Sequence, residues 1–139
     1  MSKRHDCPCD SGRALAECCG PIIDGSDQAE TAQALMRSRY SAYVLRNIDH
    51  LRRSWHPTTR PHDLDLGDPV NWLGLKILSI RDGNTHDRNG LVEFVARYKV
   101  AGRGYRLHEI SRFECLDDRW YYLSGEPGPS DSRDQAASR

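Results

Sequence analysis

The residues best suited to chemistry are cysteines, and they gather near the start of the chain. Cys7 and Cys9 form a C-x-C pair, and Cys18 and Cys19 follow after eight intervening residues. Zinc prefers four ligands in a tetrahedron and binds thiolates well. A segment too short for its own hydrophobic core can fold by closing around such an ion. The spacing therefore predicts that these four cysteines bind one structural zinc ion, with no open position left for water.

Disulfide bonds and unrelated thiols are the alternatives for this cluster. Disulfides suit secreted proteins, but the opening residues Met-Ser-Lys-Arg-His-Asp are not followed by the apolar stretch of a signal peptide. No run approaches the roughly 18 apolar residues of a membrane helix. We therefore expect a cytoplasmic protein whose cysteines stay reduced and bind metal. A compact, all-thiolate cluster favours zinc over iron.

The residues between the two cysteine pairs predict how the pairs meet. Residues 10–12, Asp-Ser-Gly, are typical of a chain reversal. Residues 13–17 are strong helix formers and span about one and a half turns. Gly20 and Pro21 are expected to end that helix. The prediction is a zinc knuckle over residues 1–22, with a linker continuing to residue 30.

The charge balance argues against a nucleic-acid or membrane-surface partner. Among 139 residues, Lys+Arg and Asp+Glu both number 20, so no net field steers the protein toward polyanions. Basic clusters at residues 52–53 and 103–106 have acidic neighbours and are interpreted as solvated surface. The length allows one ordinary domain with a small appendage.

The strongest helix pattern covers residues 32–46, with Thr31 as its N-cap. Arg39 falls near the centre of its apolar stripe, where a charge costs several kcal/mol unless it is paired. Arg39 should therefore meet a carboxylate or line a polar cavity. A second helix is predicted over residues 50–55, followed by a loop at 57–69. The apolar stripe has helical spacing and consists of Ala32, Leu35, Met36, Tyr40, Tyr43 and Val44.

The second half of the chain alternates apolar and polar residues, as strands do. Helices followed by an antiparallel meander predict an α+β fold, with the helices packed on one face of a curved sheet. This domain should cover residues 23–125. Residues 126–139 contain few apolar side chains and are predicted to form a disordered polar tail. The predicted strands are residues 73–80, 90–101, 105–116 and 119–124, with a polar connection at 81–90.

The cysteine segment resembles the SEC-C motif, a small zinc knuckle found at the C-terminus of the SecA translocase and in several bacterial proteins. The family's ligands are a C-x-C pair and a closing Cys-Cys or Cys-His pair. The resemblance therefore implies ligands at Cys7, Cys9, Cys18 and Cys19. Asp10 stands where the family usually has glycine, which allows a local change in the turn and does not imply a loss of ligation.

Further segments resemble the YchJ-like family of bacterial proteins. That family joins a SEC-C knuckle to a cone-shaped domain of the nuclear transport factor 2-like (SnoaL-like) fold, and the resemblance covers most of residues 7–125. It implies a fold but no settled activity. Some longer members close with a second SEC-C knuckle, where this chain has its polar tail. The matching segments are LMRSRYSAYV (35–44), SWHP (54–57), WLGL (72–75), VEFVARYK (92–99), LHEISRF (107–113) and RWYYLSG (119–125).

Domains of this fold often keep a pocket between the helices and the concave face of the sheet, so the resemblance implies a site there. Glu109 shares a strand face with apolar Leu107 and Phe113. It is the predicted partner of Arg39 in an ion pair that is either structural or orients a ligand. A glutamate beside arginines stays ionised, which weakens it as a catalytic acid, and no catalytic residue is assigned. The candidate pocket or ion-pair residues are Arg39, Tyr40, Trp55, His56, Arg97, His108, Glu109 and Arg112.

Several other residues favour structural roles. His56 and His108 are expected at the surface or in packing more often than in catalysis. Cys115 is expected to be a small core residue. The three tryptophans are expected to fill the core: Trp55, Trp72 and Trp120.

These observations favour a non-enzymatic binding or adaptor module. The zinc knuckle would dock a partner, with a protein or the ribosome conceivable by resemblance, and the pocket would hold a small-molecule ligand or serve dimerisation. One open alternative is a small-molecule enzyme, such as a hydrolase or isomerase, that uses the pocket. The other is RNA binding through the knuckle, where Lys3, Arg4 and Arg13 form a small basic patch.

Overall fold

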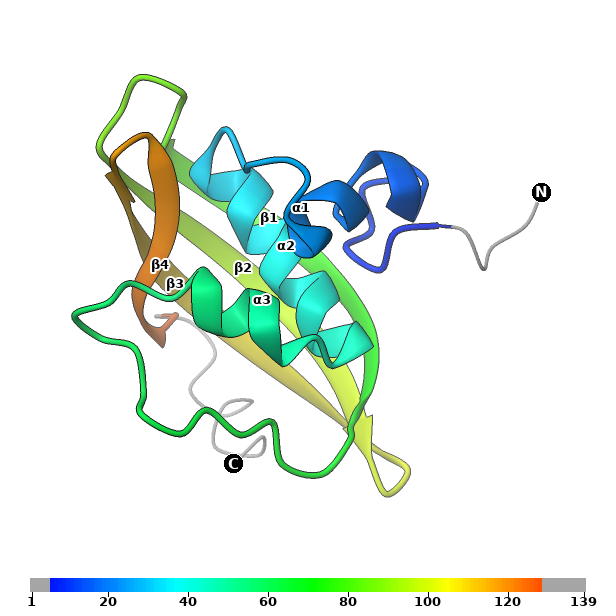
Figure 1. The fold of residues 1–139 in the computed structure, drawn as a ribbon. Coiled ribbons are helices and arrows are strands. Elements are labelled where there is room, and N and C mark those ends of the chain that lie inside the picture. The colour runs from blue at the N-terminus through cyan, green and yellow to red at the C-terminus, as the bar shows by residue number, and fades with distance from the viewer. Residues whose placement is uncertain (1–5, 129–139) are drawn as a thin grey trace.

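The structure of the protein, a computed structural model, describes residues 6–128. The helices cover one face of a four-stranded antiparallel sheet, and the cysteine segment lies beyond α1 (Figure 1). This arrangement confirms the predicted α+β class. In chain order the elements are the 3₁₀ turn η2 (Leu15–Glu17), α1 (Gly20–Asp24), α2 (Ala32–Leu45), α3 (Ile48–Arg53), β1 (Asn71–Asp82), β2 (Asn89–Val100), β3 (Arg103–Leu116) and β4 (Arg119–Pro127).

The helices α2 and α3 begin at side-chain caps. Thr31 begins α2, because its side chain accepts a hydrogen bond at 3.0 Å from a backbone N–H of the first turn. The last residue of α2 is Leu45, one residue before the predicted end at 46. Arg46 follows as the C-cap, with a left-handed φ of 58°. Ile48 begins α3 two residues earlier than expected, because the Asn47 side chain accepts from the N–H of His50 at 3.0 Å. In the part of the chain that the structure describes, no helix has the length and apolar character needed to cross a membrane.

The segment after Cys19 is helical, where a linker was expected. Gly20 and Pro21 begin α1 instead of ending a helix, because proline suits the first turn, whose N–H groups have no partner inside the helix. Gly25, with φ 89°, then ends α1. The helix expected over residues 13–17 is reduced to η2, since so few residues cannot offset the cost of nucleating an α-helix.

The sheet is a meander in which each strand pairs with its neighbour along the chain. β2 and β3 pair without interruption over their full length. Val92, Phe94 and Ala96 on one face of β2 are all buried, whereas Val100 farther along that face is exposed and Val95 on the opposite face is buried. β4 continues to Pro127, past the predicted strand end at 124. Residues 129–139 of the predicted tail lie outside the described part of the chain.

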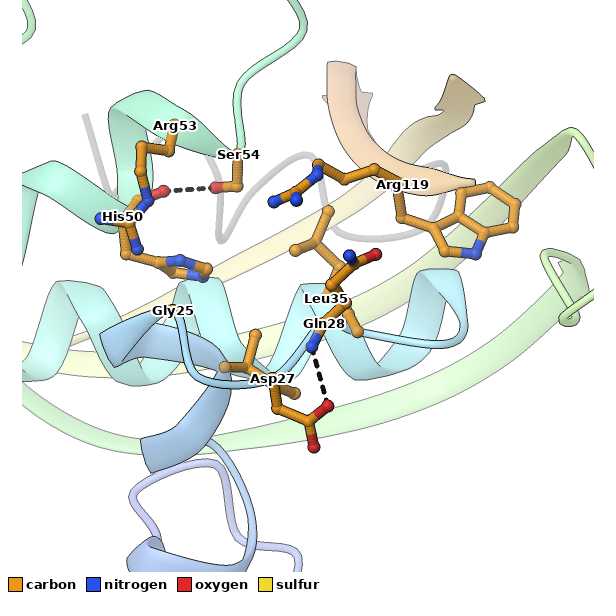
Figure 2. Close-up of a pocket in the computed structure, with 11 residues that line it drawn as sticks. Gly25, Asp27, Gln28, Leu35, His50, Arg53, Ser54 and Arg119 are labelled. Atoms are coloured by element: carbon orange, nitrogen blue, oxygen red, sulfur yellow. Dashed lines mark hydrogen bonds between the residues drawn. The ribbon is translucent and has the colours of Figure 1, made fainter. Parts of the chain in front are cut away.

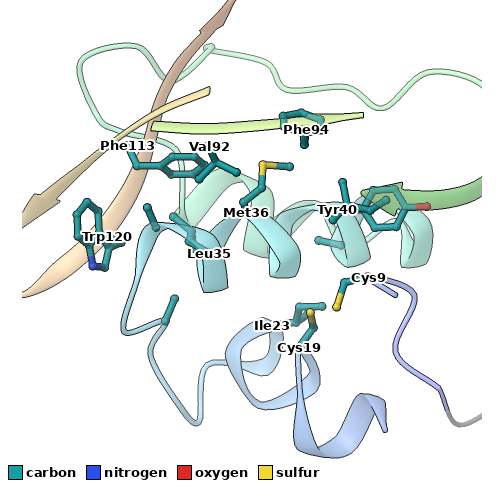
Figure 3. Close-up of a cluster of buried hydrophobic side chains, with 14 of the residues drawn as sticks. Cys9, Cys19, Ile23, Leu35, Met36, Tyr40, Val92, Phe94, Phe113 and Trp120 are labelled. Atoms are coloured by element: carbon teal, nitrogen blue, oxygen red, sulfur yellow. The ribbon is translucent and has the colours of Figure 1, made fainter. Parts of the chain in front are cut away.

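One cluster of buried side chains joins the helices, the sheet and the cysteine segment (Figure 3). At one end of α2, Leu35 lies close to Trp120 of β4. Near the other end, Cys9 and Cys19 belong to the same buried cluster. Through Cys9 and Cys19, the segment predicted as a knuckle over residues 1–22 therefore packs into the same core as the helices and the sheet.

His50 of α3 is buried, with 4% of its surface exposed, and its neighbours fix its protonation state. Ser38 Oγ donates to the carbonyl oxygen of Leu35 at 2.8 Å, so it accepts from His50 Nε2, which lies 2.9 Å away. Burial, together with the positive charges of Arg39 and Arg53, lowers the pKa of His50 to about 4. The imidazole is therefore neutral at neutral pH.

We predict that His50 makes the fold less stable in acid. Its pKa is about 4 in the folded chain and 6.5 in the unfolded chain, so the unfolded chain binds the proton more readily. Its contribution to the free energy of unfolding is complete above pH 6.5, and roughly 3 kcal/mol of it is lost as the pH falls toward 4. Urea unfolding of wild type and His50→Gln at matched pH measures this. The stability difference between the two proteins should shrink across that window, and a constant difference would contradict the prediction.

Candidate functional site

The sulfur atoms of Cys7, Cys9, Cys18 and Cys19 all lie within 4.8 Å of one another. Cys9 Sγ is 3.6 Å from Cys18 Sγ, which is 3.9 Å from Cys19 Sγ. Four thiolates around one zinc ion, each about 2.3 Å from the metal, lie about 3.8 Å apart. All five cysteines of the chain are free thiols, so the disulfide alternative does not hold in this structure. The four sulfurs fit a tetrahedral metal site.

Backbone hydrogen bonds bring the two cysteine pairs together. The N–H of Cys7 donates to the carbonyl of Arg13 at 2.9 Å, and the N–H of Asp10 donates to the carbonyl of Cys7 at 3.2 Å. These bonds close the first loop. The N–H of Cys18 donates to the carbonyl of Leu15 at 3.1 Å, so η2 turns the second pair back onto the first.

The electrostatics of the cluster favour one ionised sulfur and oppose further ionisation. The hydrogen bond with Cys19 lowers the pKa of Cys9 to about 4 against the effect of burial, with help from Ser11 and Arg37. The same bond and burial raise the pKa of Cys19, and burial raises that of Cys18. Four thiolates at this spacing therefore need a cation among them.

Polar contacts to α2 fasten the cysteine segment to the fold. Cys7 Sγ lies 3.5 Å from Ser41 Oγ. Arg37 Nη1 donates to the carbonyl of Cys9 at 2.8 Å and lies 3.7 Å from its sulfur. Sequence reasoning missed both supports, because nothing in the α2 pattern indicates which polar residues face the cysteines.

Asp10 makes the corresponding contact to β1. Its Oδ2 accepts a hydrogen bond from the backbone N–H of Leu75 at 3.1 Å. A Cβ on Gly74 would lie 2.8 Å from that oxygen, so the glycine makes room for the carboxylate. Asp10 has a left-handed φ of 64°, which glycine adopts without strain and aspartate tolerates better than most residues. The departure from the SEC-C pattern thus keeps the turn and adds an anchor.

A cavity of about 280 Å³ lies between α2 and the inner face of the sheet. Burial raises the pKa values of Tyr40 and Tyr122 to about 12, so both are neutral at ordinary pH. Apolar and aromatic side chains form most of the wall. The lining residues are Met36, Arg39, Tyr40, Tyr43, Trp72, Phe94, Ala96, Leu107, Glu109, Ser111 and Tyr122.

Arg39 is buried at this cavity, with 3% of its surface exposed. Its Nη1 donates to the carbonyl of Leu51 at 3.0 Å and to Ser54 Oγ at 2.7 Å. The guanidinium also faces two rings, 5.0 Å from the centroid of Trp55 and 4.4 Å from that of Tyr122. Burial lowers the pKa of Arg39, and these partners keep the cation in place. Arg39 thus lies at a cavity, although the wall of this cavity is mostly apolar and not polar as predicted.

Glu109 lines the same cavity, and its charge favours the charged form of Arg39. Its Oε2 accepts a hydrogen bond from Ser111 Oγ at 3.1 Å. A side chain at Gly125 would overlap that oxygen, so the glycine gives the carboxylate its space. The structure places the predicted partners in one cavity, and a direct hydrogen bond between them stays a prediction. Ser111 could have been found from the sequence, because it alternates with Glu109 on one strand face.

Of the predicted residues, Tyr40 lines the cavity together with Arg39 and Glu109, whereas Trp55 is not part of the lining and contacts Arg39 through its ring. His56 Nε2 is 2.7 Å from Glu114 Oε1, and His108 Nε2 is 2.7 Å from Glu93 Oε2. These contacts give both histidines structural partners. The predicted residues that do not line the 280 Å³ cavity are Trp55, His56, Arg97, His108 and Arg112.

The remaining structural predictions have mixed outcomes. Trp120 is buried, whereas Trp55 and Trp72 are half-buried, and Trp72 lines the 280 Å³ cavity. Cys115 is half-buried on β3. Arg13 is exposed and its side chain donates to the carbonyl of Glu17. The other two members of the predicted basic patch, at positions 3 and 4, lie outside the described residues.

A smaller cavity of about 50 Å³ lies among α3, β4 and the segment after α1 (Figure 2). His50, Arg53 and Arg119 lie around it. Arg53 Nη2 donates to the carbonyl of Ile23 at 2.8 Å, which ties α3 to α1. This volume suits a few water molecules and not an organic ligand.

The fold and the cysteine centre define a SEC-C motif joined to a nuclear transport factor 2-like domain. The SEC-C motif model matches residues 6–21, and the model of the YchJ middle NTF2-like domain matches residues 31–125. The chain belongs to the YchJ-like UPF0225 family. This membership confirms the resemblance found in the sequence.

Relatives and solved structures agree with this assignment. A UPF0225 protein of Chromobacterium violaceum is 51% identical over 126 residues, covering 88% of this chain and 93% of the relative. The solution structure of a SEC-C motif containing protein from Rhodopseudomonas palustris has a TM-score of 0.76 at 33% identity, covering 88% of this chain and 98% of the other. The crystal structure of a SEC-C motif containing protein from Psychrobacter arcticus has a TM-score of 0.72 at 26% identity, covering 91% of this chain and 84% of the other.

We predict that Asp10 contributes measurably to stability through its anchor to β1. Asp10→Ala removes the acceptor for the Leu75 N–H and places alanine in a left-handed conformation, so the free energy of unfolding should fall by about 2–4 kcal/mol. Asp10→Asn keeps both an acceptor and a tolerance for that conformation, and should lose less than half as much. Urea unfolding of metal-saturated proteins measures both losses. Equal losses would show that the contact does not stabilise the fold.

Proposed function

We propose that this protein is a zinc-binding, non-enzymatic adaptor, in which a structural zinc knuckle presents a docking surface beside a domain that holds a small ligand. The observation that carries the proposal is the closed geometry of the four cysteines, whose sulfurs all lie within 4.8 Å of one another. Four protein ligands complete a tetrahedron, so the metal has no position for a substrate or an activated water. The ion would therefore hold the knuckle in shape.

The chemistry of the donor set supports zinc as the metal. The donors are all sulfur, which suits zinc and excludes the oxygen-seeking ions magnesium and calcium. Three of the four cysteines are buried, which limits exchange of the ion with solvent. Free thiolates of this kind persist in a reducing compartment such as the cytoplasm, where we place the protein.

The zinc assignment predicts one zinc ion per chain after purification under reducing conditions with zinc supplied. Cys9→Ser should lose most of the bound metal and lower the melting temperature, because one ligand of a core-packed site is gone. Cys115→Ser is the matched control, since it removes the cysteine outside the cluster and should keep full occupancy. Elemental analysis by mass spectrometry measures the ratio of metal to protein. A wild-type protein without stoichiometric zinc would refute the assignment.

The outward side of the knuckle is the surface that supports docking. Gly12, Arg13, Ala16 and Glu17 are exposed, whereas Cys7 and Cys9 face α2 through the contacts described above. The knuckle therefore presents a short rigid ridge to solvent. Its mixed charge suits a protein partner better than a polyanion.

The docking role predicts a partner that depends on this ridge. Ala16→Arg combined with Glu17→Arg changes the exposed surface without touching a cysteine, so it should abolish partner capture at unchanged zinc content. Cys18→Ser combined with Cys19→Ser should abolish both partner capture and zinc binding. Affinity capture from the native cytoplasm, quantified against wild type, measures these losses. Partners that persist with the surface variant would place recognition elsewhere on the molecule.

The cavity favours a second candidate, an enzyme of the hydrolase or isomerase kind. The specific observation is that Arg39 and Glu109 line one cavity of about 280 Å³, and such a pair can orient a small substrate and stabilise charge. Turnover of a small molecule that Glu109→Gln stops, at unchanged zinc content, would support this alternative over the adaptor.

A further inference from the structure

We propose that Arg37 and Ser41 of α2, together with Ser11, form an outer shell of hydrogen bonds around the metal centre. This shell offsets part of the negative charge on the sulfurs and slows release of the ion. The inference deepens the zinc assignment of the proposed function and rests on it. The juxtaposition that carries it is one side-chain donor beside each of three of the four sulfurs.

Ser41 brings a hydroxyl from α2 to the cluster. The residue is completely buried, and its Oγ lies 3.5 Å from Cys7 Sγ. A metal-bound cysteine has lost its proton, so its sulfur can only accept and the hydroxyl must donate. A buried hydroxyl needs a hydrogen-bond partner, and the thiolate supplies one. The pair therefore suits a ligated sulfur better than a free thiol.

Arg37 brings a positive charge. Its Nη1 donates to the carbonyl of Cys9 at 2.8 Å and lies 3.7 Å from the sulfur of the same residue. Four thiolates around a divalent ion leave a net negative charge, and three of the four cysteines are buried, where uncompensated charge is costly. The guanidinium offsets part of that charge. Because arginine stays protonated at any ordinary pH, the compensation is permanent.

Ser11 serves the sulfur that lies nearest to solvent. Its Oγ accepts a hydrogen bond from the backbone N–H of Arg13 at 3.2 Å, which leaves its own proton free to donate. Cys18 Sγ lies 3.2 Å from that oxygen, and Cys18 is the one cysteine of the cluster that is partly exposed. Hydrogen bonds to a thiolate draw electron density from the sulfur, so it attracts protons and electrophiles less strongly.

Two of the three donors come from outside the cysteine segment. The SEC-C motif model ends at residue 21, whereas Arg37 and Ser41 lie within the region matched by the NTF2-like domain. They are four residues apart on α2, so they lie one turn apart on the same side of the helix. The metal centre therefore takes most of its outer shell from the neighbouring domain. Retention of the ion depends on α2 as well as on the four ligands.

The first test measures how fast zinc leaves the full-length protein when a colorimetric chelator is added in excess. Arg37→Met keeps an apolar stem and removes the charge and the donors, so zinc should leave about tenfold faster. Ser41→Ala removes only the hydroxyl and should accelerate release by a smaller factor.

Arg46→Met is the matched control for the release rate. Arg46 Nη2 donates to the carbonyl of Gly67 at 2.7 Å, so the variant loses an arginine–carbonyl bond of the same kind without touching a cysteine. It should release zinc at the wild-type rate. Unchanged rates in Arg37→Met and Ser41→Ala, or equal acceleration by Arg46→Met, would overturn the proposal.

The second test uses cobalt(II) in place of zinc, because its sulfur-to-metal charge-transfer band reports how tightly the sulfurs hold their electrons. Loss of a hydrogen bond to sulfur should move the band to longer wavelength in Arg37→Met and Ser41→Ala. Arg37→Lys keeps the positive charge and should lie between Arg37→Met and wild type. Arg46→Met should match wild type. Loss of a purely mechanical tie leaves the band in place, so a band at one wavelength in all these proteins would overturn the proposal.

Zinc content, measured in parallel, separates this proposal from the zinc assignment. A wild-type protein that binds no zinc would overturn both. A wild-type protein with full zinc, and variants with unchanged release and unchanged spectra, would overturn the outer shell alone.

Discussion

Four sulfur atoms held within 4.8 Å of one another impose the main electrostatic constraint on this fold. Each thiolate makes the next harder to form, so the site reaches full ligation only with a cation at its centre. The constraint extends beyond the knuckle, because Arg37 and Ser41 of α2 contact the same cysteines. On the same helix Arg39 follows Arg37 by two residues and Tyr43 follows Ser41 by two, and both line the cavity. One helix therefore supports both the cysteine cluster and the cavity.

The cavity illustrates how a buried charge is retained. Arg39 is held by a backbone carbonyl, a hydroxyl and two aromatic rings, none of which carries a negative charge. Glu109 supplies the balancing charge from across the cavity. Such an arrangement is less stable than a filled apolar core of the same size would be.

Much of this structure follows from sequence pattern, and the failures have physical causes. The cysteine spacing predicted that the four sulfurs lie together, as they do, and strand alternation placed Glu109 on the face that lines the cavity. Pro21 was misassigned because proline ends helices and also begins them, and only packing decides between the two. The His56–Glu114 and His108–Glu93 contacts join residues far apart along the chain, so no local pattern reveals them. The tyrosines around Arg39 were recognised as apolar but not as cavity walls, because periodicity does not report voids.

The bond from Leu75 to Asp10 has a consequence for self-association. β1 is the outermost strand of the sheet, and such strands present unpaired backbone groups that can pair with another molecule. Asp10 occupies one of these groups, while Leu73 and Leu78 nearby are 51% and 43% exposed. If the cysteine segment detached from β1, the Leu75 N–H would lose its partner, and an edge strand with two exposed leucines would be open to pairing with another molecule. The contact that holds Asp10 on β1 thus also covers part of the open edge of the sheet.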